Sequence, residues 1–346
     1  MILFRVDASP EIGLGHLMRC LALAQGFHEI NLPTVFVVRE SSLNCTELLL
    51  HQGITVTSIP KDTSIKKEIE FLKAAISKYS PLAVVLDGYD FGYEYQQQLK
   101  SDKLKLVFIG SNNDHHYAAD IIVNQNIWAT KEALYNNISG DVKLLLGNKY
   151  LLLRNEILKA EPVVINNRLS NILVTFGGSR YSMHSFTIYD CLKDLPFLFN
   201  LVAGDNAGGL MEKNPLTGLN DHQFNHNLSV FKNIYDLSSL MQQADLVICA
   251  AGSTCWELCY LGVPFITYIL ADNQEQNAAC LQNLGISLNM GWWQDFDCNR
   301  CRQTIISLAD NPQQRKDMHK AARKIVDGKG VERVVREIVY TTAKGV

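Results

Sequence analysis

The chain has 346 residues, of which 47% are hydrophobic and 19% charged, and its formal net charge is -3. This composition excludes disordered, collagenous and low-complexity proteins, and the length predicts two domains of ordinary size. The small negative charge argues against nucleic acid as a partner, because nucleic-acid binders present a basic face.

The start of the chain, MILFRVDASP, does not form a signal peptide, because Arg5 and Asp7 interrupt the apolar run. No apolar stretch reaches the roughly 18 residues that a membrane span needs. The nine cysteines show no disulfide framework in their spacing and are interpreted as reduced thiols. These features predict a soluble, cytoplasmic protein without stable membrane insertion, and they leave the oligomeric state open.

Short apolar runs, typical of buried strands, alternate with helical patterns along the chain. The predicted strands of the first half are ILFRVD (2–7), TVFVV (34–38), AVVLD (83–87), LVFI (106–109) and DIIVN (120–124). Those of the second half are NILVTF (171–176), FLFNLVA (197–203), LSVF (228–231), DLVICA (245–250) and PFITYI (264–269). The predicted helices are 16–30, 65–80, 235–244, 253–262 and 273–285. This alternation predicts βαβ units and parallel sheets covered on both faces.

The alternation pauses once, in the polar stretch NEILKAEPVVINNRLSN (155–171). A domain boundary there predicts an N-terminal Rossmann-like domain over 1–158 and a C-terminal one over 159–346, with a ligand cleft between them. The last segment, from Pro312, has a helical pattern, and the sequence leaves open whether it crosses back over the first domain.

The segment DASPEIGLGH (7–16) joins the first predicted strand to the first predicted helix. Gly13 and Gly15 allow close approach of the backbone to a ligand at a helix N-terminus. His16 stands where an imidazole can act as a general base. On spacing alone, a glycine turn with a histidine that caps the helix is the more frequent interpretation.

A second glycine turn, TFGGS (175–179), follows the first strand of the second domain. The backbone amides of Gly177 and Gly178 could hold a phosphate or sugar hydroxyls. In isolation, a plain turn between strand and helix is the more frequent interpretation.

The most specific segment is DLVICAAGSTCWELCYLGVPFITYILADNQEQNA (245–278). Two neighbouring strands end there, and each is followed by a helix whose N-terminus favours a diphosphate. Glu257, four residues after Ser253, is expected to accept hydrogen bonds from a ribose diol. Asn273 could contact substrate or cap the following helix. The substrate-binding residues predicted here are Gly252, Ser253, Thr254, Glu257, Asn273 and Gln274.

Other patterns favour structural roles. Cys298 and Cys301 form a single CxxC, and His115–His116 has no second cluster of metal ligands nearby. Trp292–Trp293 is interpreted as packing. No metal site and no cofactor is therefore predicted.

The sequence resembles the UDP-2,4-diacetamido-2,4,6-trideoxy-β-L-altropyranose hydrolases of pseudaminic acid biosynthesis. The resemblance covers most of the chain and rests on RVDASPEIGLGHLMRCLALA (5–24), LDGYDF (86–91), ADIIVNQN (119–126), LLLGNKYLLLR (144–154), ILVTFGG (172–178) and AAGSTCWELCYLGVPFITYILADNQEQNA (250–278). It implies a GT-B-like α/β fold, with two Rossmann-like domains facing a central cleft. It also implies hydrolysis of a UDP-sugar with inversion at the anomeric carbon and without metal.

Carried over by motif, the resemblance implies that His16 is the general base, and it places Arg19 among the substrate-binding residues. Tyr89 would lie near the sugar, Glu257 at the ribose and Asn273 near the substrate. By looser analogy, the uracil would rest against the backbone around Phe231 and Ile234. Many relatives carry paired aspartates where this chain has Ser111–Asp114, which puts the sugar specificity and the hydrolytic activity in question.

Three functions remain in competition. The first is the UDP-sugar hydrolase, which requires that UDP release depend on His16. The second is a GT-B glycosyltransferase that uses a UDP-sugar donor and releases UDP only with an added acceptor. The third is a non-catalytic sugar-nucleotide-binding protein of a surface polysaccharide system, motivated by the missing aspartate pair.

Overall fold

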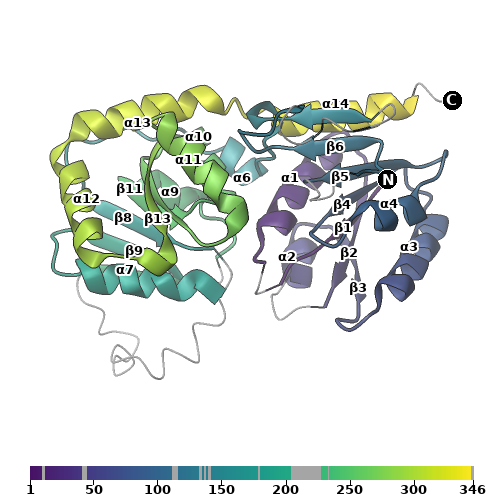
Figure 1. Cartoon of the computed structure of the whole chain (residues 1–346), viewed down its shortest axis with the longest axis horizontal. Coiled ribbons are helices and arrows are strands. Elements are labelled where there is room, and N and C mark those ends of the chain that lie inside the picture. Colours follow the sequence, from purple (N-terminus) through teal and green to yellow (C-terminus); the bar gives the residue numbers. More distant parts are fainter. Residues whose placement is uncertain are drawn as a thin grey trace. The chain divides into compact units, whose positions relative to one another are not determined.

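The computed structural model describes residues 1–9, 12–40, 45–110, 116–131, 135, 138, 142–177, 180–203, 227–232 and 234–343. The chain divides into two compact units, Met1–Asn155 together with Gly328–Val346, and Glu156–Asp327 (Figure 1). Each unit is built on one sheet whose strand pairs are all parallel. The predicted α/β class with two Rossmann-like domains is confirmed.

The sheet of the first unit has the strand order β3-β2-β1-β4-β5-β6-β7. The order reverses between β1 and β4, so right-handed crossovers place helices on both faces of the sheet. Its strands are β1 (Ile2–Val6), β2 (Thr34–Arg39), β3 (Thr55–Ile59), β4 (Ala83–Asp87), β5 (Lys105–Ile109), β6 (Ile121–Asn124) and β7 (Lys143–Leu146). Its helices are α1 (Gly15–Glu29), α2 (Cys45–His51), α3 (Ile65–Tyr79), α4 (Tyr93–Leu99), the 3-10 turn η1 (Asn148–Tyr150) and α14 (Gly330–Ala343).

The sheet of the second unit has the order β10-β9-β8-β11-β12-β13, which reverses between β8 and β11. Its strands are β8 (Asn171–Thr175), β9 (Leu198–Ala203), β10 (Leu228–Lys232), β11 (Leu246–Ala250), β12 (Phe265–Ile269) and β13 (Ser287–Trp292). Its helices are α7 (His184–Leu192), α9 (Ser238–Gln243), α10 (Thr254–Leu261), α11 (Glu275–Asn283), α12 (Cys298–Asp310) and α13 (Pro312–Ile325). Short 3-10 turns are η2 (Arg180–Met183), η5 (Asp272–Gln274) and η6 (Trp293–Asp295), and α6 (Asn155–Leu158) spans the division between the units.

The ten strands predicted from apolar runs are all present, but β3, β7 and β13 were not predicted. All three lie at an edge of their sheet. Each of them contains exposed or half-buried residues, whereas every residue of β1 and β4 is buried. An edge strand needs no continuous apolar run, so its sequence resembles that of a loop.

The C-terminal helix α14 belongs to the first unit (Figure 1). It packs against α1 so closely that a Cβ added at Gly26 would lie 2.2 Å from a methyl carbon of Val331. Gly330, at its start, lies against the backbone of Leu151. The helix therefore packs with the N-terminal half of the chain, while the predicted boundary at 158 and 159 stays a prediction.

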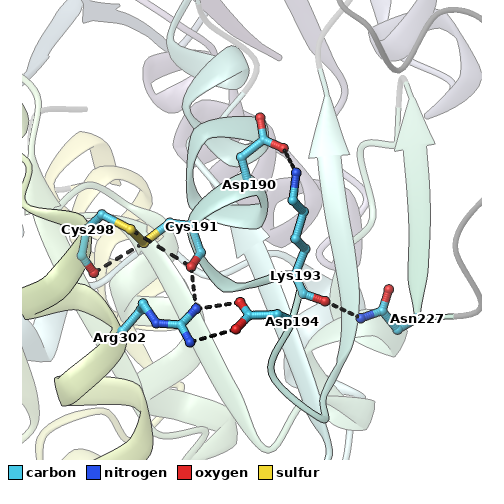
Figure 2. A network of polar contacts seen from close by, with 7 residues as sticks. All are labelled: Asp190, Cys191, Lys193, Asp194, Asn227, Cys298 and Arg302. Atoms are coloured by element: carbon cyan, nitrogen blue, oxygen red, sulfur yellow. Dashed lines mark hydrogen bonds and ion pairs between the residues drawn. A yellow bond between two sulfur atoms is a disulfide. The ribbon is translucent and has the colours of Figure 1, made fainter.

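A disulfide joins Cys191, at the end of α7, to Cys298, the first residue of α12, with a Cα–Cα distance of 5.7 Å (Figure 2). Arg302 of α12 also connects this helix to the end of α7, because it donates to the Cys191 carbonyl at 2.8 Å and forms two bonds to Asp194 at 2.5 and 2.8 Å. The prediction that all nine cysteines are reduced thiols is therefore wrong for this pair. Its members are 107 residues apart, and no local spacing indicates a pair that only the fold brings together.

Candidate functional site

The first group of predicted residues lies at the carboxyl ends of β1 and β4, where the strand order of the first sheet reverses. Ligands of open α/β sheets bind at this position, because the crossovers diverge there. Asp7 follows β1, and Asp87 is the last residue of β4. The Asp7 backbone N–H donates to the Asp87 carbonyl at 3.0 Å, which fixes the two strand ends side by side.

His16, in the first turn of α1, lies against Asp87. Its Nδ1 is 2.5 Å from Asp87 Oδ1, and its side chain is 12% exposed. Arg19, one turn further along α1, donates to both carboxylate oxygens, at 2.6 Å from Nε and 2.5 Å from Nη2. Arg19 Nη2 is also 3.0 Å from His16 Nδ1. Asp87 can only accept, so its contact of 2.5 Å with Nδ1 requires a proton there, and we assign the Nδ1 proton to the bond with Asp87. Nδ1 then has no lone pair to accept from Arg19 Nη2.

The Asp87 carboxylate is fully buried, and burial by itself raises the pKa of a carboxyl group. The charge of Arg19 and the contact with His16 outweigh this effect, so the pKa of Asp87 lies below its usual value. The Cys20 thiol donates to Asp87 Oδ2 at 3.3 Å. Burial and the Asp87 charge raise the pKa of Cys20 well above its usual range, so the thiol stays protonated. Asp87 is therefore an ionised acceptor held by three donors.

The glycine turn before α1 shapes the approach to His16. Gly13 has a φ of 76°, and its N–H donates to the Ser9 carbonyl at 2.7 Å. Gly15 is the first residue of α1, and the N-cap residue is Leu14, without a side-chain cap. The interpretation of His16 as a helix cap is therefore excluded.

Tyr89 and its loop form a wall beside His16. The Tyr89 ring is 59% exposed and meets the His16 ring edge-on, with centroids 4.9 Å apart. The neighbouring Gly88 has no room for a side chain, because an added Cβ would lie 2.4 Å from Asp7 Oδ2 and 2.7 Å from Phe91. This tight packing fixes the loop that carries Tyr89 directly after Asp87.

A buried network of charges supports the same strand ends. Arg5, in β1, pairs with Asp7 at 2.7 Å and with Glu68 of α3 at 2.8 Å. Glu68 also pairs with Arg39 and accepts a hydrogen bond from Tyr95 at 2.7 Å. Burial raises the pKa of Asp7 above its usual value despite the opposing effect of Arg5.

Sequence reasoning missed Asp87 as a site residue and missed the network around Arg5. The signal for Asp87 was available, since AVVLD is an apolar strand that ends in a carboxylate at the edge where His16 was expected. Glu68, which pairs with Arg5, and His16, which contacts Asp87, lie 63 and 71 residues away from these partners along the chain, so no local pattern indicates them. The predicted departure at Ser111–Asp114 lies outside the described residues.

The second group of predicted residues lies at the carboxyl ends of β8 and β11, where the second sheet reverses its order. Gly177, two residues after β8, has a φ of 78°, and Gly178 lies outside the described residues. Ser253 is the N-cap residue of α10 without a side-chain cap, and Thr254 begins the helix. Glu257 is in the first turn of α10.

Two neighbouring strand ends converge in this unit. Gln274, after β12, accepts a hydrogen bond from the Leu270 N–H at 2.9 Å. Its side-chain nitrogen is 3.8 Å from the position of a Cβ added at Gly252, which follows β11. Asn273 is exposed in η5, and the N-cap residue of α11 is Gln274, so Asn273 does not cap that helix.

Phe231 lies in β10, the edge strand that pairs with β9, and is partly buried. Ile234 follows the strand and is also partly buried. The two predicted groups thus belong to different units: His16, Arg19 and Tyr89 to the first, and the residues after Gly177 to the second.

An aromatic cluster surrounds Phe176, the residue directly after β8. The His184 ring stacks on Trp293 at 4.0 Å, and Phe176 meets Trp293 edge-on at 5.2 Å. Burial lowers the pKa of His184 to about 4, so its imidazole is neutral at neutral pH. Trp293 also stacks on Phe296 at 4.8 Å, which agrees with the packing role predicted for it.

Among the described residues, no group of three or more His, Cys, Asp or Glu side chains could hold a metal ion. Cys298 is in the disulfide and Cys301 is a buried thiol, so the CxxC is not a paired dithiol. Within the same part of the chain, no helix combines the length and apolar character required to cross a membrane.

Residues 208–334 match the glycosyltransferase family 28 C-terminal domain. A structure of MurG from Acinetobacter baumannii superimposes with a TM-score of 0.63 at 19% identity, over 98% of this chain and 99% of that one. The chain therefore has a GT-B-like fold of two α/β domains.

Curated relatives extend the similarity to both units. The chain is 28% identical to an uncharacterized protein of Methanocaldococcus jannaschii over 78% of its length, and it spans 55% of that protein. It is 23% identical to the spore coat polysaccharide biosynthesis protein SpsG of Bacillus subtilis, over 95% of this chain and 94% of that protein. It is 22% identical to the UDP-2,4-diacetamido-2,4,6-trideoxy-beta-L-altropyranose hydrolase of Campylobacter jejuni, over 82% of this chain and 97% of the enzyme. These matches support a relationship to GT-B proteins of sugar-nucleotide chemistry.

Proposed function

We propose that the chain hydrolyses a UDP-linked diacetamido-trideoxy sugar to UDP and the free sugar, with inversion at the anomeric carbon, in nonulosonic (pseudaminic) acid biosynthesis. The observation that carries the proposal is the contact of 2.5 Å between His16 Nδ1 and the buried Asp87, beside Tyr89. The similarity to the Campylobacter jejuni hydrolase supports the substrate class.

The His16–Asp87 pair suits a general base. Because Asp87 accepts the Nδ1 proton, Nε2 carries the lone pair, and among the described residues nothing hydrogen-bonds to Nε2. In the proposed step Nε2 takes a proton from water while the water oxygen bonds to the anomeric carbon. The anomeric C–O bond breaks, and its electron pair goes to the departing oxygen of the diphosphate. Asp87 stabilises the imidazolium that forms.

The second unit is proposed to hold the leaving group. The N-terminus of α10 presents backbone N–H groups after Gly252 and Ser253, and these would stabilise the charge that develops on the diphosphate. Glu257 would accept hydrogen bonds from the ribose hydroxyls. Gly177 and Gly178 would approach the phosphates.

The remaining predicted residues receive positioning roles. Arg19, predicted to bind substrate, is instead proposed to keep Asp87 ionised and aligned with His16 through its two bonds to the carboxylate. Tyr89 would contact the sugar, and Asn273 and Gln274 would lie near the substrate. The backbone around Phe231 and Ile234 would support the uracil.

The test is NMR of the purified chain with UDP-2,4-diacetamido-2,4,6-trideoxy-β-L-altrose and no acceptor. Free sugar and UDP are expected together, with a loss of rate in His16→Ala of about 100-fold or more. His51→Ala serves as the matched control, because His51 is an exposed histidine of the same unit. Unchanged turnover in His16→Ala would contradict the proposed base.

A glycosyltransferase is the second candidate function, favoured by the match of residues 208–334 to a glycosyltransferase domain. The same base would then deprotonate an acceptor hydroxyl instead of water. UDP release that requires an added acceptor would establish this function and refute hydrolysis. UDP binding with no turnover under either condition would instead indicate a non-catalytic binding protein.

A further inference from the structure

A groove of about 570 Å³ opens at the carboxyl edge of the first sheet, between the start of α3 and the loop from β4 to α4. Its volume lies within the roughly 300–1,000 Å³ of small-molecule sites. Asp90, in its wall, directly follows Tyr89, whose ring touches His16. We name it the Tyr93 groove after the aromatic ring in its lining.

The walls of the Tyr93 groove are fixed by one fully buried amide, Gln96. Gln96 Nε2 donates to the Phe91 carbonyl at 2.8 Å, and its Oε1 accepts from the Ala118 and Ala119 N–H groups at 3.0 and 3.1 Å. These bonds tie the β4–α4 loop to Ala118 and Ala119, which closely follow the lining residue His116. The groove is therefore formed before any ligand arrives, which reduces the entropy cost of binding.

The charge of the lining selects against anions. Asp90 and Glu94 supply two exposed carboxylates, and none of the described residues that line the groove is Lys or Arg. A phosphate or carboxylate ligand would be repelled by these two carboxylates, and no lysine or arginine among the described lining residues would offset the repulsion. The sugar nucleotide's own diphosphate is thus an unsuitable occupant.

The other lining groups match an uncharged saccharide. Tyr93 is 36% exposed, and its ring lies 6.1 Å from that of His116, which leaves an aromatic surface in the wall. The negative face of such a ring attracts the polarised C–H groups of a pyranose. Sugar hydroxyls can donate to the two carboxylates and exchange hydrogen bonds with the Gln98 amide.

We propose that the Tyr93 groove is a second carbohydrate subsite, which binds a saccharide without acidic groups beside the loop that carries Tyr89. The inference rests on the proposed function in taking a sugar as the ligand. The proposed subsite lies within the first unit, whereas the nucleotide is proposed to bind the second. Saccharide binding can therefore be measured without nucleotide.

The test is titration of the full chain with N-acetylglucosamine and N,N′-diacetylchitobiose, followed by protein NMR or calorimetry. Glucuronic acid serves as the anionic counterpart. Tyr93→Ala is expected to weaken binding of the neutral sugars about fivefold or more, because it removes the ring contact. Tyr340→Ala is the matched control, since Tyr340 is an exposed tyrosine of α14 in the same unit. Glu94→Gln tests the wall independently and is expected to weaken the same sugars about two- to threefold.

Saturable binding of a neutral sugar that weakens in Tyr93→Ala and not in Tyr340→Ala supports the subsite. No binding up to about 10 mM, equal binding of glucuronic acid, or unchanged affinity in both Tyr93→Ala and Glu94→Gln overturns it. His16→Ala is expected to leave this binding unchanged. If turnover is lost in His16→Ala but no saccharide binds, the subsite is refuted and the proposed base is not. If a saccharide binds but His16→Ala keeps full turnover, the proposed base is refuted and the subsite is not.

Discussion

Removal of the Cys191–Cys298 disulfide is expected to destabilise the second unit by about 2–4 kcal/mol. The bond closes a loop with a sequence separation of 107 residues. Chain entropy alone assigns such a loop about 4.8 kcal/mol at 25 °C, which is an upper value because reduced chains retain residual structure. Replacing both cysteines by serine keeps the two bonds between Arg302 and Asp194, so the difference measures the covalent link itself (Figure 2).

The expected loss can be expressed as a melting temperature. The second unit runs from Glu156 to Asp327, and an unfolding entropy of about 2.1 cal/mol/K per residue gives it about 0.36 kcal/mol/K. A loss of 2–4 kcal/mol then lowers its Tm by about 6–11 °C. Calorimetry without reductant follows this transition, and the first unit, which lacks the disulfide, serves as an internal reference.

Cys280→Ser is the matched control, because Cys280 is a partly buried free thiol of the same unit. Thiol titration of the denatured, unreduced chain is expected to find the seven free cysteines, and reduction should expose the remaining two. The reasoning is refuted if all nine thiols react without reductant. It is equally refuted if the double serine variant melts within about 1 °C of Cys280→Ser.

Three further predictions concern side chains that can carry a charge. Asp87→Asn should lower the rate of UDP release about 100-fold or more while UDP binding stays unchanged, because the tautomer of His16, the proposed base, is no longer fixed. Steady-state kinetics and UDP titration measure these two quantities, and a loss of UDP affinity as large as the loss of rate would contradict the prediction. The pKa of His184 is about 4 in the folded chain, below the unfolded value of about 6.5. Between these values the unfolded chain binds more protons, so the free energy of unfolding should fall as the pH drops from 6.5 to 4. Denaturation of His184→Phe should show a smaller fall over the same pH range. Arg5→Met should cost about 3–5 kcal/mol in urea denaturation, because it leaves the buried Asp7 carboxylate without its cation and Glu68 with Arg39 as its remaining cation. A cost under about 1 kcal/mol would contradict the role of this network.

The central strands could be predicted because each is a continuous apolar run buried on both faces, as ILFRV and AVVLD are. The edge strand TVTSI could not, since Ile59 is its one buried residue and its pattern is that of a loop. The helices could be predicted where apolar residues recur with the helical period. The 3.6-residue pattern of IKKEIEFLKAAISKY predicted α3, and Ser64, the residue that caps it, accepts from Lys67 N–H.

The candidate site was predictable where chemistry coincides with a glycine turn. His16 stands out beside Gly13 and Gly15, and the helix starts at Gly15, close to its predicted start. Asp87 was not predicted as a site residue because an aspartate at a strand end is also a common loop residue. The pairing of β4 with β1 brings it to His16. The disulfide was not predicted either, because a contact between residues far apart in the sequence leaves no local pattern.

The return of α14 to the first unit has a consequence for biosynthesis. The segment from Glu156 to Asp327 is continuous, so the second unit can complete its fold while the chain is still being synthesised. The first unit cannot, because Val331 of α14, which fills the space above Gly26 of α1, is synthesised after the whole of the second unit. The unit whose strands are synthesised before those of the other is therefore completed after it, and α1 keeps an uncovered apolar face until α14 is synthesised.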